Sequence, residues 1–320
     1  MSIVKVNLTD IKQQMNATFD LFICSSSFEG RCLSIANNIN VDKIKRALIL
    51  SNIEPLDYVK DNQAKLVSLF GEKGQIIKTS ILNPLLTADN FQKSITTAIN
   101  NGLSRSIFLD ITTFTHESLL IILRLLRIHC EKIKITGGYA NASEYSSGDD
   151  VKHKWLSRGI GDVRSILGYP GKIIPSRKTH LVIIVGYEHE RAAGIIETID
   201  PNSIALGFGQ SSSATTEKDK DANEHFMMLV EQMATSFSNV NRFVIPCDNP
   251  RGTHDELVAQ VRKVEDKNVI IAPMNNKLST IGAAWTAFEN DNIQLCYAQA
   301  LSYNYKSYSS PGTQCYLFDL

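Results

Sequence analysis

Two short polar turns hold most of the side chains in this sequence that could do chemistry. The first, residues 25–31, reads Ser-Ser-Ser-Phe-Glu-Gly-Arg, and the second, residues 186–191, reads Gly-Tyr-Glu-His-Glu-Arg. Hydroxyl groups can donate hydrogen bonds to phosphate or ribose oxygens, and a guanidinium group can bind an anion through two parallel hydrogen bonds. The ligand-binding residues that these turns predict are Ser25, Ser26, Ser27, Arg31, Gly186, Tyr187, Glu188 and Arg191.

A purely structural role competes with this prediction. Ser27 could cap a following helix, and Glu29 and Arg31 could form an ion pair within their own domain. Neither turn contains the glycine-rich motif of a conventional dinucleotide site or of a phosphate-loop ATPase, so neither of these classes is indicated.

A second pair of turns also follows apolar strand patterns. Residues 110–115 read Asp-Ile-Thr-Thr-Phe-Thr, and residues 273–277 read Pro-Met-Asn-Asn-Lys. A lysine near a helix N-terminus favours an anionic ligand, and asparagine amides can bind a base or a sugar. The binding residues predicted here are Thr112, Thr115, Asn275, Asn276 and Lys277, and the candidate catalytic residues are Glu29 and Asp110.

Alternating strand and helix patterns must position these turns. In the first half, the hydrophobic pattern predicts strands at residues 21–24, 47–50, 75–79, 107–110 and 133–136, and helices at 31–39, 57–70, 88–100 and 117–130. In the second half, strands are predicted at 181–185, 203–208, 242–245, 268–272 and 293–297, and helices at 191–199, 222–237, 254–264 and 279–289. This alternation predicts the α/β class, with doubly wound parallel sheets covered on both faces.

The two halves resemble one another. Residues 20–39 align without a gap with residues 180–199, so that Arg31 falls on Arg191. Farther along, Asn83-Pro84-x-x-Thr87 matches Asn249-Pro250-x-x-Thr253, and residues 107–109 match residues 269–271. We therefore predict two tandem Rossmann-like domains related by an internal duplication, although chance similarity between two ordinary α/β segments is the alternative. The predicted domains are residues 1–150 and 179–320, joined by a connector at 151–178 with a short helical piece around 155–167.

Composition limits the partners. Hydrophobic residues make up 43% of the chain, enough for two packed cores, and 33 basic residues balance 33 acidic ones. A net charge of zero gives no strong nucleic-acid signature and no attraction to a membrane. The first thirty residues lack a secretory apolar core, which favours a cytoplasmic protein. The six cysteines show no metal-binding or disulfide spacing, so no metal is predicted, and no cofactor can be named.

Two further segments could contribute to binding. Residues 139–145 and 303–308 place tyrosines after the fifth strand of each half, where they could stack on a nucleobase or simply pack at a rim. The segment between the halves carries Arg158 and Arg164, which could reach a cleft or a partner, or belong to a solvated connector.

The strand-end turns resemble those of the CRISPR-associated Rossmann-fold (CARF) sensor domains, in which a strand ending in Asp or Asn passes through a Thr- or Ser-rich turn into an apolar helix. Residues 25–27 and 110–115 are the matching turns of the first half. The glycine pair and lysine usual in that family are missing after Thr112, and the second half keeps Lys277 but lacks the acid. The resemblance implies cyclic-oligonucleotide binding by two fused halves that imitate a dimer. More broadly, the paired turns resemble proteins of prokaryotic antiviral defence systems.

Three functions follow as hypotheses. The leading one is a sensor or regulatory protein of a defence system that binds a nucleotide or another small anionic ligand and acts on a protein partner or as a homo-oligomer. The second is an enzyme acting on a nucleoside or phosphoester, with Glu29 or Asp110 as the general base and Arg31 or Lys277 stabilising negative charge. The third is a non-catalytic structural subunit of a multiprotein defence complex.

Overall fold

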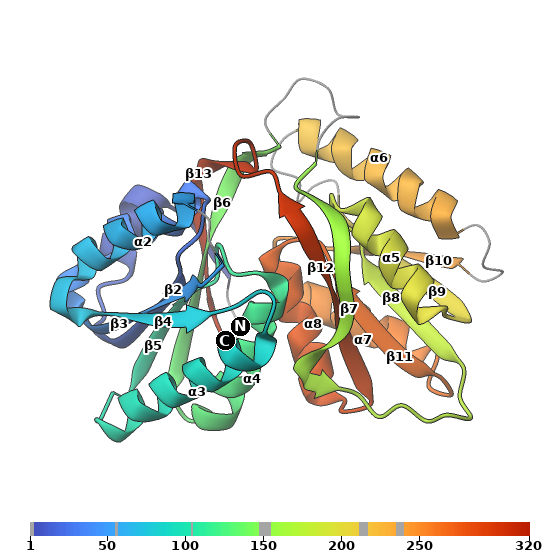
Figure 1. Ribbon diagram of the computed structural model, residues 1–320, viewed down its shortest axis with the longest axis horizontal. Coiled ribbons are helices and arrows are strands. Elements are labelled where there is room, and N and C mark those ends of the chain that lie inside the picture. The colour runs from blue at the N-terminus through green and yellow to red at the C-terminus, as the bar shows by residue number, and fades with distance from the viewer. Residues whose placement is uncertain (1–2, 55–56, 104, 147–154, 211–216, 235–239) are drawn as a thin grey trace. The chain divides into compact units, whose positions relative to one another are not determined.

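The chain forms two compact units in a computed structural model that describes residues 3–54, 57–103, 105–146, 155–210, 217–234 and 240–320. Unit 1 comprises Met1–Ser143 together with Ser309–Leu320, and unit 2 comprises Glu144–Tyr308. Each unit contains one mixed sheet that is mostly parallel and is interleaved with helices (Figure 1). The predicted fold class is therefore confirmed.

Unit 1 is built on a seven-stranded sheet with the order β1-β13-β6-β5-β2-β3-β4. Strands β2 to β6 pair in parallel, whereas β1 and β13 pair antiparallel at one edge. The strands are β1 (Val4–Asn7), β2 (Phe19–Ser25), β3 (Ile44–Asn52), β4 (Gly74–Thr79), β5 (Ser106–Asp110), β6 (Lys134–Tyr145) and β13 (Ser309–Asp319). The helices are α1 (Ile11–Gln14), α2 (Asp57–Phe70), α3 (Pro84–Asn100) and α4 (His116–His129).

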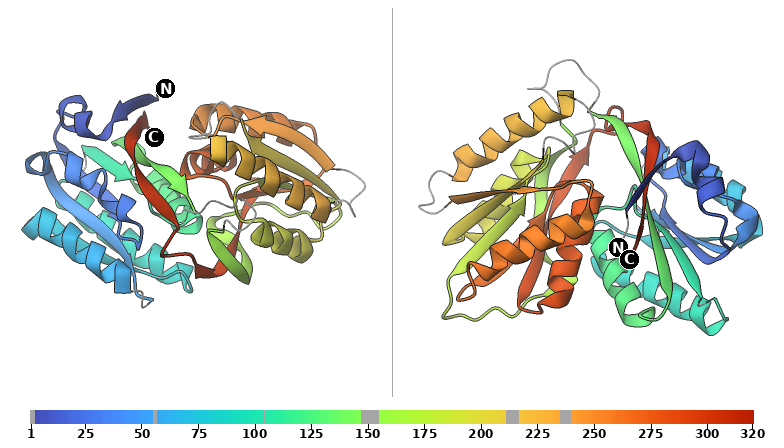
Figure 2. Two further views of the ribbon diagram at one scale, coloured as in Figure 1. Left: turned by 90° about the horizontal axis from the view of Figure 1, so that it is seen from above. Right: turned by 180° about the vertical axis from the view of Figure 1, so that it is seen from behind.

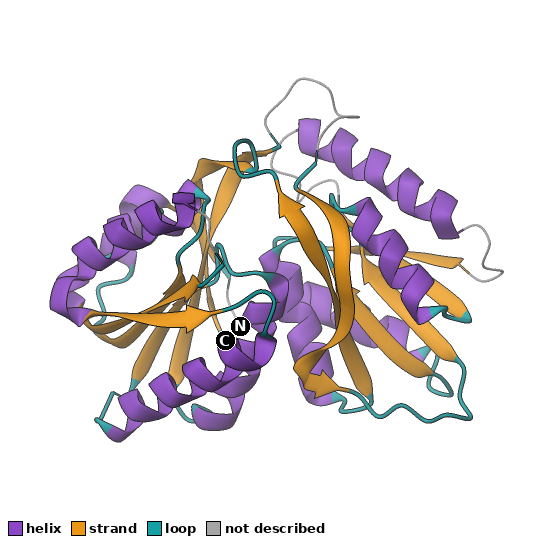
Figure 3. Ribbon diagram, viewed as in Figure 1, coloured by secondary structure: helices purple, strands orange, loops and turns teal. Residues whose placement is uncertain are grey.

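Unit 2 is built on a six-stranded sheet with the order β10-β9-β8-β11-β12-β7. Its strands are β7 (Ser157–Pro170), β8 (Thr179–Ile184), β9 (Ser203–Gly209), β10 (Val240–Ile245), β11 (Asn268–Pro273) and β12 (Ile293–Tyr303). Its helices are α5 (His189–Ile199), α6 (Glu217–Ala234), α7 (Pro250–Arg262) and α8 (Lys277–Glu289). Helix α5 packs against α6, and α7 packs against α8 (Figure 3).

The two sheets share one topology. In chain order, the five parallel strands of each unit lie as third, second, first, fourth and fifth. The matched Asn-Pro motifs also have one structure: Asn83 caps α3 and Asn249 caps α7, with proline at the first helical position in both. The strand pairing shifts one part of the sequence alignment. Leu21 pairs with Ile107 and Leu181 with Ile270, so Ile107 corresponds to Ile270 and not to residue 269.

The helix predicted at residues 31–39 does not form. The segment instead makes two short 3₁₀ turns, Gly30–Leu33 and Ala36–Asn38. Its serine and two asparagines compete with the helix by bonding to nearby backbone, as when the Asn38 side chain donates to the Ser34 carbonyl at 2.9 Å. The matching segment in unit 2 has Gly194, Glu197 and Thr198 at these three positions, and it forms α5.

Each sheet also receives one strand from the other half of the chain. Strand β7, within the segment predicted as a connector, pairs antiparallel with β12, and β13 returns to lie between β1 and β6. Domain boundaries thus differ from those predicted at 150 and 179, because residues 309–320 belong to unit 1 and β7 to unit 2. The helix expected around 155–167 is replaced by β7, where Gly159 and Gly168 adopt positive φ angles. Residues 151–154 of the predicted connector lie outside the described residues.

Both cores lie where the parallel strands are buried on their two faces. In unit 1, the Phe22 ring stacks on Phe108 with centroids 5.5 Å apart and contacts Phe70 at 5.1 Å. In unit 2, the core is aliphatic and includes Leu181, Ile183, Ile195 and Leu206. Among the described residues, no helix is long and apolar enough to cross a membrane.

Candidate functional site

The turn after β2 is held by a buried ion pair. Glu29 Oε2 lies 2.6 Å from Arg31 Nη2, and both side chains are nine-tenths or more buried. The Ser309 hydroxyl, at the start of β13, donates to the same Glu29 oxygen at 2.6 Å, and Arg31 Nη1 donates to the Ala140 carbonyl of β6 at 3.3 Å. We call Ser309, Glu29 and Arg31 the first clamp. It joins the turn to two strands of the sheet.

The turn after β8 has a second clamp of the same design, formed by Ser157, Glu188 and Arg191. Arg191 pairs with Glu188, and the Ser157 hydroxyl, at the start of β7, donates to the other Glu188 oxygen. Arg191 Nε donates to the Ala298 carbonyl of β12 at 2.7 Å. Burial lowers the pKa of Arg191, but the Glu188 carboxylate together with Tyr297 and Tyr303 outweighs this effect, so the pKa is raised. Both predicted arginines therefore bind groups of their own chain, and ligand contact by them stays a prediction.

The three serines of the first turn bond mainly to backbone. The Ser26 hydroxyl donates to the Leu50 carbonyl at 3.3 Å, and the Ser25 hydroxyl donates to the Ser26 carbonyl at 3.2 Å. Ser27 Oγ accepts from the Glu29 amide at 3.2 Å, so it stabilises the turn and does not cap an α-helix. Ser26 and Ser27 are buried, whereas Ser25 is half-buried.

Asp110 ends β5 inside the protein, with 2% of its surface exposed. Its Oδ1 accepts hydrogen bonds from the Thr112 amide at 3.0 Å and hydroxyl at 2.5 Å. Within the described part of the chain, Oδ2 has no hydrogen-bond partner. Burial raises the pKa of Asp110 to about 7, against the opposing influence of Thr112 and of the Arg31 charge. The carboxyl is thus available to neither solvent nor a bound substrate.

Thr112 links Asp110 to the first clamp. The Thr112 oxygen accepts from the Ala140 amide at 3.0 Å, and the Ala140 carbonyl accepts from Arg31. The structure therefore joins Glu29 and Arg31 of the first turn to Asp110 and Thr112 of the second in one buried network. Thr115 lies apart from that network as the N-cap of α4, where its hydroxyl oxygen accepts from the Ser118 amide at 3.1 Å.

The corresponding turn in unit 2 is held by asparagines. Asn275 Nδ2 donates to the Val185 carbonyl at 2.6 Å, and Asn276 caps α8 by accepting from the Ser279 amide at 2.9 Å. Lys277, the first residue of α8, is half-buried. Gly186 lies against the other turn so closely that a Cβ there would sit 2.2 Å from the Met274 carbonyl oxygen. Only glycine allows these two strand-end turns to meet.

Aromatic side chains gather at the carboxyl end of the unit 2 sheet. The Tyr187 ring contacts Tyr145 at 5.8 Å and Phe226 at 5.4 Å. Both His189 and His225 lie 5.6 Å from Phe226, centroid to centroid. Burial lowers the pKa of His189, Glu190 raises it, and His225 lowers it further, so the two imidazoles lie within electrostatic range of one another.

More rings come from the segments that join the exchanged strands. Tyr303 lies 6.3 Å from Tyr308, Tyr305 is 43% exposed, and the exposed Arg158 guanidinium lies 4.4 Å from the centre of the Trp155 ring. We call the whole set the aromatic rim: Tyr145, Trp155, Tyr187, His189, His225, Phe226, Tyr303, Tyr305 and Tyr308.

Sequence reasoning found only part of this rim. The sequence predicts the tyrosine segments and Tyr187 as candidates, but it does not predict His189, His225 or Phe226. His225 and Phe226 lie within α6, where a histidine and a phenylalanine fit an ordinary amphipathic pattern and carry no local signal of a site. Among the described residues, no cluster of three or more potential metal ligands occurs.

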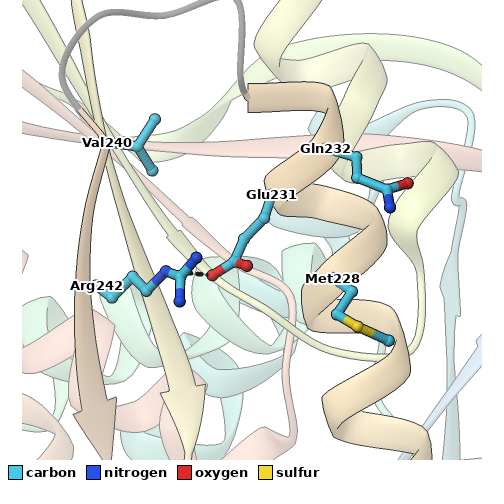
Figure 4. A pocket seen from close by; sticks show the side chains of 5 residues that line it. All are labelled: Met228, Glu231, Gln232, Val240 and Arg242. Carbon is cyan, nitrogen blue, oxygen red and sulfur yellow. Dashed lines mark ion pairs between the residues drawn. The ribbon is translucent and has the colours of Figure 1, made fainter.

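A separate hollow lies between α6 and β10. It has a volume of about 420 Å³ and is lined by Met228, Glu231, Gln232, Val240 and Arg242. Figure 4 shows the Glu231 and Arg242 side chains pointing toward one another, with Arg242 Nε 2.5 Å from Glu231 Oε1. This hollow contains none of the residues that the sequence predicts for binding.

No protein-family model matches the chain, and no curated protein matches it by sequence. The solved structures that align with it include the cytoplasmic domain of a prokaryotic cation chloride cotransporter, at 10% identity and a TM-score of 0.27, covering 90% of this chain and 99% of that one. Another is UDP-GlcNAc 2-epimerase from Neisseria meningitidis bound to UDP-GlcNAc, at 9% identity and a TM-score of 0.24, covering 80% and 77%. Neither similarity indicates a ligand or an activity for this chain.

Proposed function

We propose that this protein is a sensor that binds a nucleotide or nucleotide-derived signal on the aromatic rim of unit 2. The observation that carries the proposal is the position of the rim. Tyr187 and His189 directly follow β8, and Tyr303 ends β12, so these rings lie at the carboxyl end of a parallel sheet. In open α/β sheets, ligands bind outside this end, where the direction of strand winding reverses.

The chemistry of the rim suits a flat, negatively charged ligand. Aromatic side chains can stack on any of the nucleobases. The guanidinium of Arg158 can interact with an aromatic ring and also with a phosphate. Tyr305, Lys306 and Arg158 are exposed, so they can meet a ligand without rearrangement of the core. Half-buried His189 and His225 add hydrogen-bonding groups beside the Phe226 ring.

Burial of the candidate acids favours binding over catalysis. Glu29 is held by Arg31 and Ser309, and Asp110 is almost completely buried, so neither carboxyl can reach a substrate without opening the sheet end. A general base must lie within hydrogen-bonding distance of the proton that it removes. The resemblance to CARF sensors supports cyclic oligonucleotides as the first ligand class to test, and a role in antiviral defence as the biological context of the proposal.

Calorimetric titration with mono-, di- and cyclic oligonucleotides tests the proposal. We expect at least one of them to bind, and Tyr305→Leu and Arg158→Gln to weaken that binding roughly tenfold, because one stacked base contributes about 1–3 kcal/mol. Tyr316→Leu is the matched control, because Tyr316 is a half-buried tyrosine of unit 1 that contacts Tyr139. Absence of heat with the whole panel, or equal weakening by the control, would contradict the proposal.

A further inference from the structure

The two segments that lead into the exchanged strands are hydrogen-bonded to one another. One segment runs from β6 to β7, and the other runs from β12 to β13. The Asn304 amide donates to the Leu156 carbonyl at 2.9 Å, and Asn304 Nδ2 donates to the Trp155 carbonyl at 3.1 Å. The Ser146 amide also donates to the Tyr308 carbonyl at 2.9 Å. A displacement of one segment must therefore displace the other or break these bonds.

The same segments carry rim residues on one side and clamp serines on the other. Trp155 stands two residues before Ser157, and Tyr308 stands immediately before Ser309. Each serine is the first residue of an exchanged strand and donates to a buried glutamate. The covalent path from rim to clamp is thus one or two residues long in both segments.

From this arrangement we propose that the state of the aromatic rim is transmitted to the β2 turn of unit 1 through the joined segments and the first clamp. The inference rests on the proposed function for its ligand, and it names how binding at that site would be reported elsewhere. A ligand that moves residues 303–308 would shift Ser309, whose hydroxyl bonds the Glu29 carboxylate. Loss of that hydrogen bond leaves the buried Glu29 oxygen held by Arg31 alone, which weakens the turn and favours its rearrangement.

The hydrogen bonds of the first clamp continue beyond the β2 turn. Arg31 bonds the Ala140 carbonyl, the Ala140 amide bonds Thr112, and Thr112 bonds Asp110. A change at Ser309 therefore reaches the middle of β6 and the end of β5 through continuous hydrogen bonds. Unit 2 has a matching clamp, in which the Ser157 hydroxyl donates to Glu188.

Hydrogen exchange in the full-length protein without ligand tests the transmission. Asn304→Ala removes the side-chain bond between the two segments, and the reporters are the Cys32 and Ser34 amides, which donate to the Glu29 and Arg31 carbonyls. We expect exchange at these amides to become about tenfold faster, the factor expected when one hydrogen bond of the turn is weakened.

Two further variants identify the route. In a Ser309→Ala background, the Asn304→Ala change should add no further acceleration at the reporters, because its path to the turn is already broken. Asn290→Ala is the control, since Asn290 is another unit 2 asparagine whose side chain bonds to backbone, here by accepting from the Asn292 amide at 3.0 Å. Unchanged reporters in Asn304→Ala, or equal acceleration by the control, would overturn the inference. Because no ligand is added, this result is independent of the nucleotide titrations.

Discussion

Asp110→Asn should change how the stability of the protein depends on pH. Burial raises the pKa of Asp110 from 3.8 to about 7, so the folded protein holds a proton that the unfolded chain releases at lower pH. The free energy of unfolding must then fall as the pH rises from about 4 to about 7, and stay constant above that range. Asparagine cannot titrate, so the variant lacks this contribution.

The size of the effect follows from the two pKa values. Each pH unit between the two pKa values changes the free energy of unfolding by about 1.4 kcal/mol. Between pH 5 and pH 8, only the part below the folded pKa of about 7 contributes, which is about two pH units. Relative to the variant, the wild-type protein should lose about 3 kcal/mol over this range. Urea denaturation at pH 5, 6, 7 and 8 measures the difference, provided that the two proteins share the same slope with denaturant.

Asp20→Asn is the control, because the pKa of Asp20 is lowered, whereas that of Asp110 is raised. Asp20 is also buried, which would raise its pKa, but its hydrogen bond with Lys45, with an N···O distance of 2.7 Å, contributes to a net lowering. The stability that Asp20 contributes is present above its unfolded value near 4 and is lost only in more acidic solution. Its difference from wild type should therefore be constant from pH 5 to pH 8. If the Asp110→Asn difference is constant as well, Asp110 is ionised in the folded protein and the reasoning is refuted.

Two further predictions concern the fold. Gly186→Ala should lower the free energy of unfolding by roughly 1–3 kcal/mol, because its Cβ would meet the Met274 carbonyl at 2.2 Å, whereas Gly30→Ala, with its nearest atom at 3.8 Å, should have little effect in the same urea assay. Truncation after Tyr308 removes β13 and should abolish hydrogen-exchange protection of β2 in unit 1, and a protected β2 would show that the exchanged strand is dispensable.

The alternating pattern of the sequence predicted the parallel strands well, because strands buried on both faces leave continuous apolar runs such as Leu21–Cys24. The Asn-Pro motifs also predicted matching helix starts, since a cap and a proline act locally. The destination of β7 and β13 could not be predicted. Periodicity indicates that a segment is a strand, but the sheet that it joins depends on partners far away in the chain.

The clamps show the same limit at the level of single residues. Arg31 and Glu29 are two residues apart, so an ion pair between them is one of the alternatives that the sequence indicates, and the structure contains it. Ser309, which completes the clamp, lies 278 residues from Arg31, and no local pattern connects the two. The rim likewise combines rings from five separate segments. The sequence therefore predicts where the strand-end turns lie. Only the folded chain shows which side chains of these turns are already hydrogen-bonded or paired within the protein.

The pairing of β1 with β13 places the first and last strands of the chain side by side (Figure 2), with Val4 opposite Leu317. A short peptide joining these strands would close the backbone into a ring without disturbing either sheet. Such a ring could be opened elsewhere, so that the second half precedes the first. The pairing of β1 with β13 therefore does not require the first half to precede the second, and we expect a circularly permuted chain to form the same two sheets.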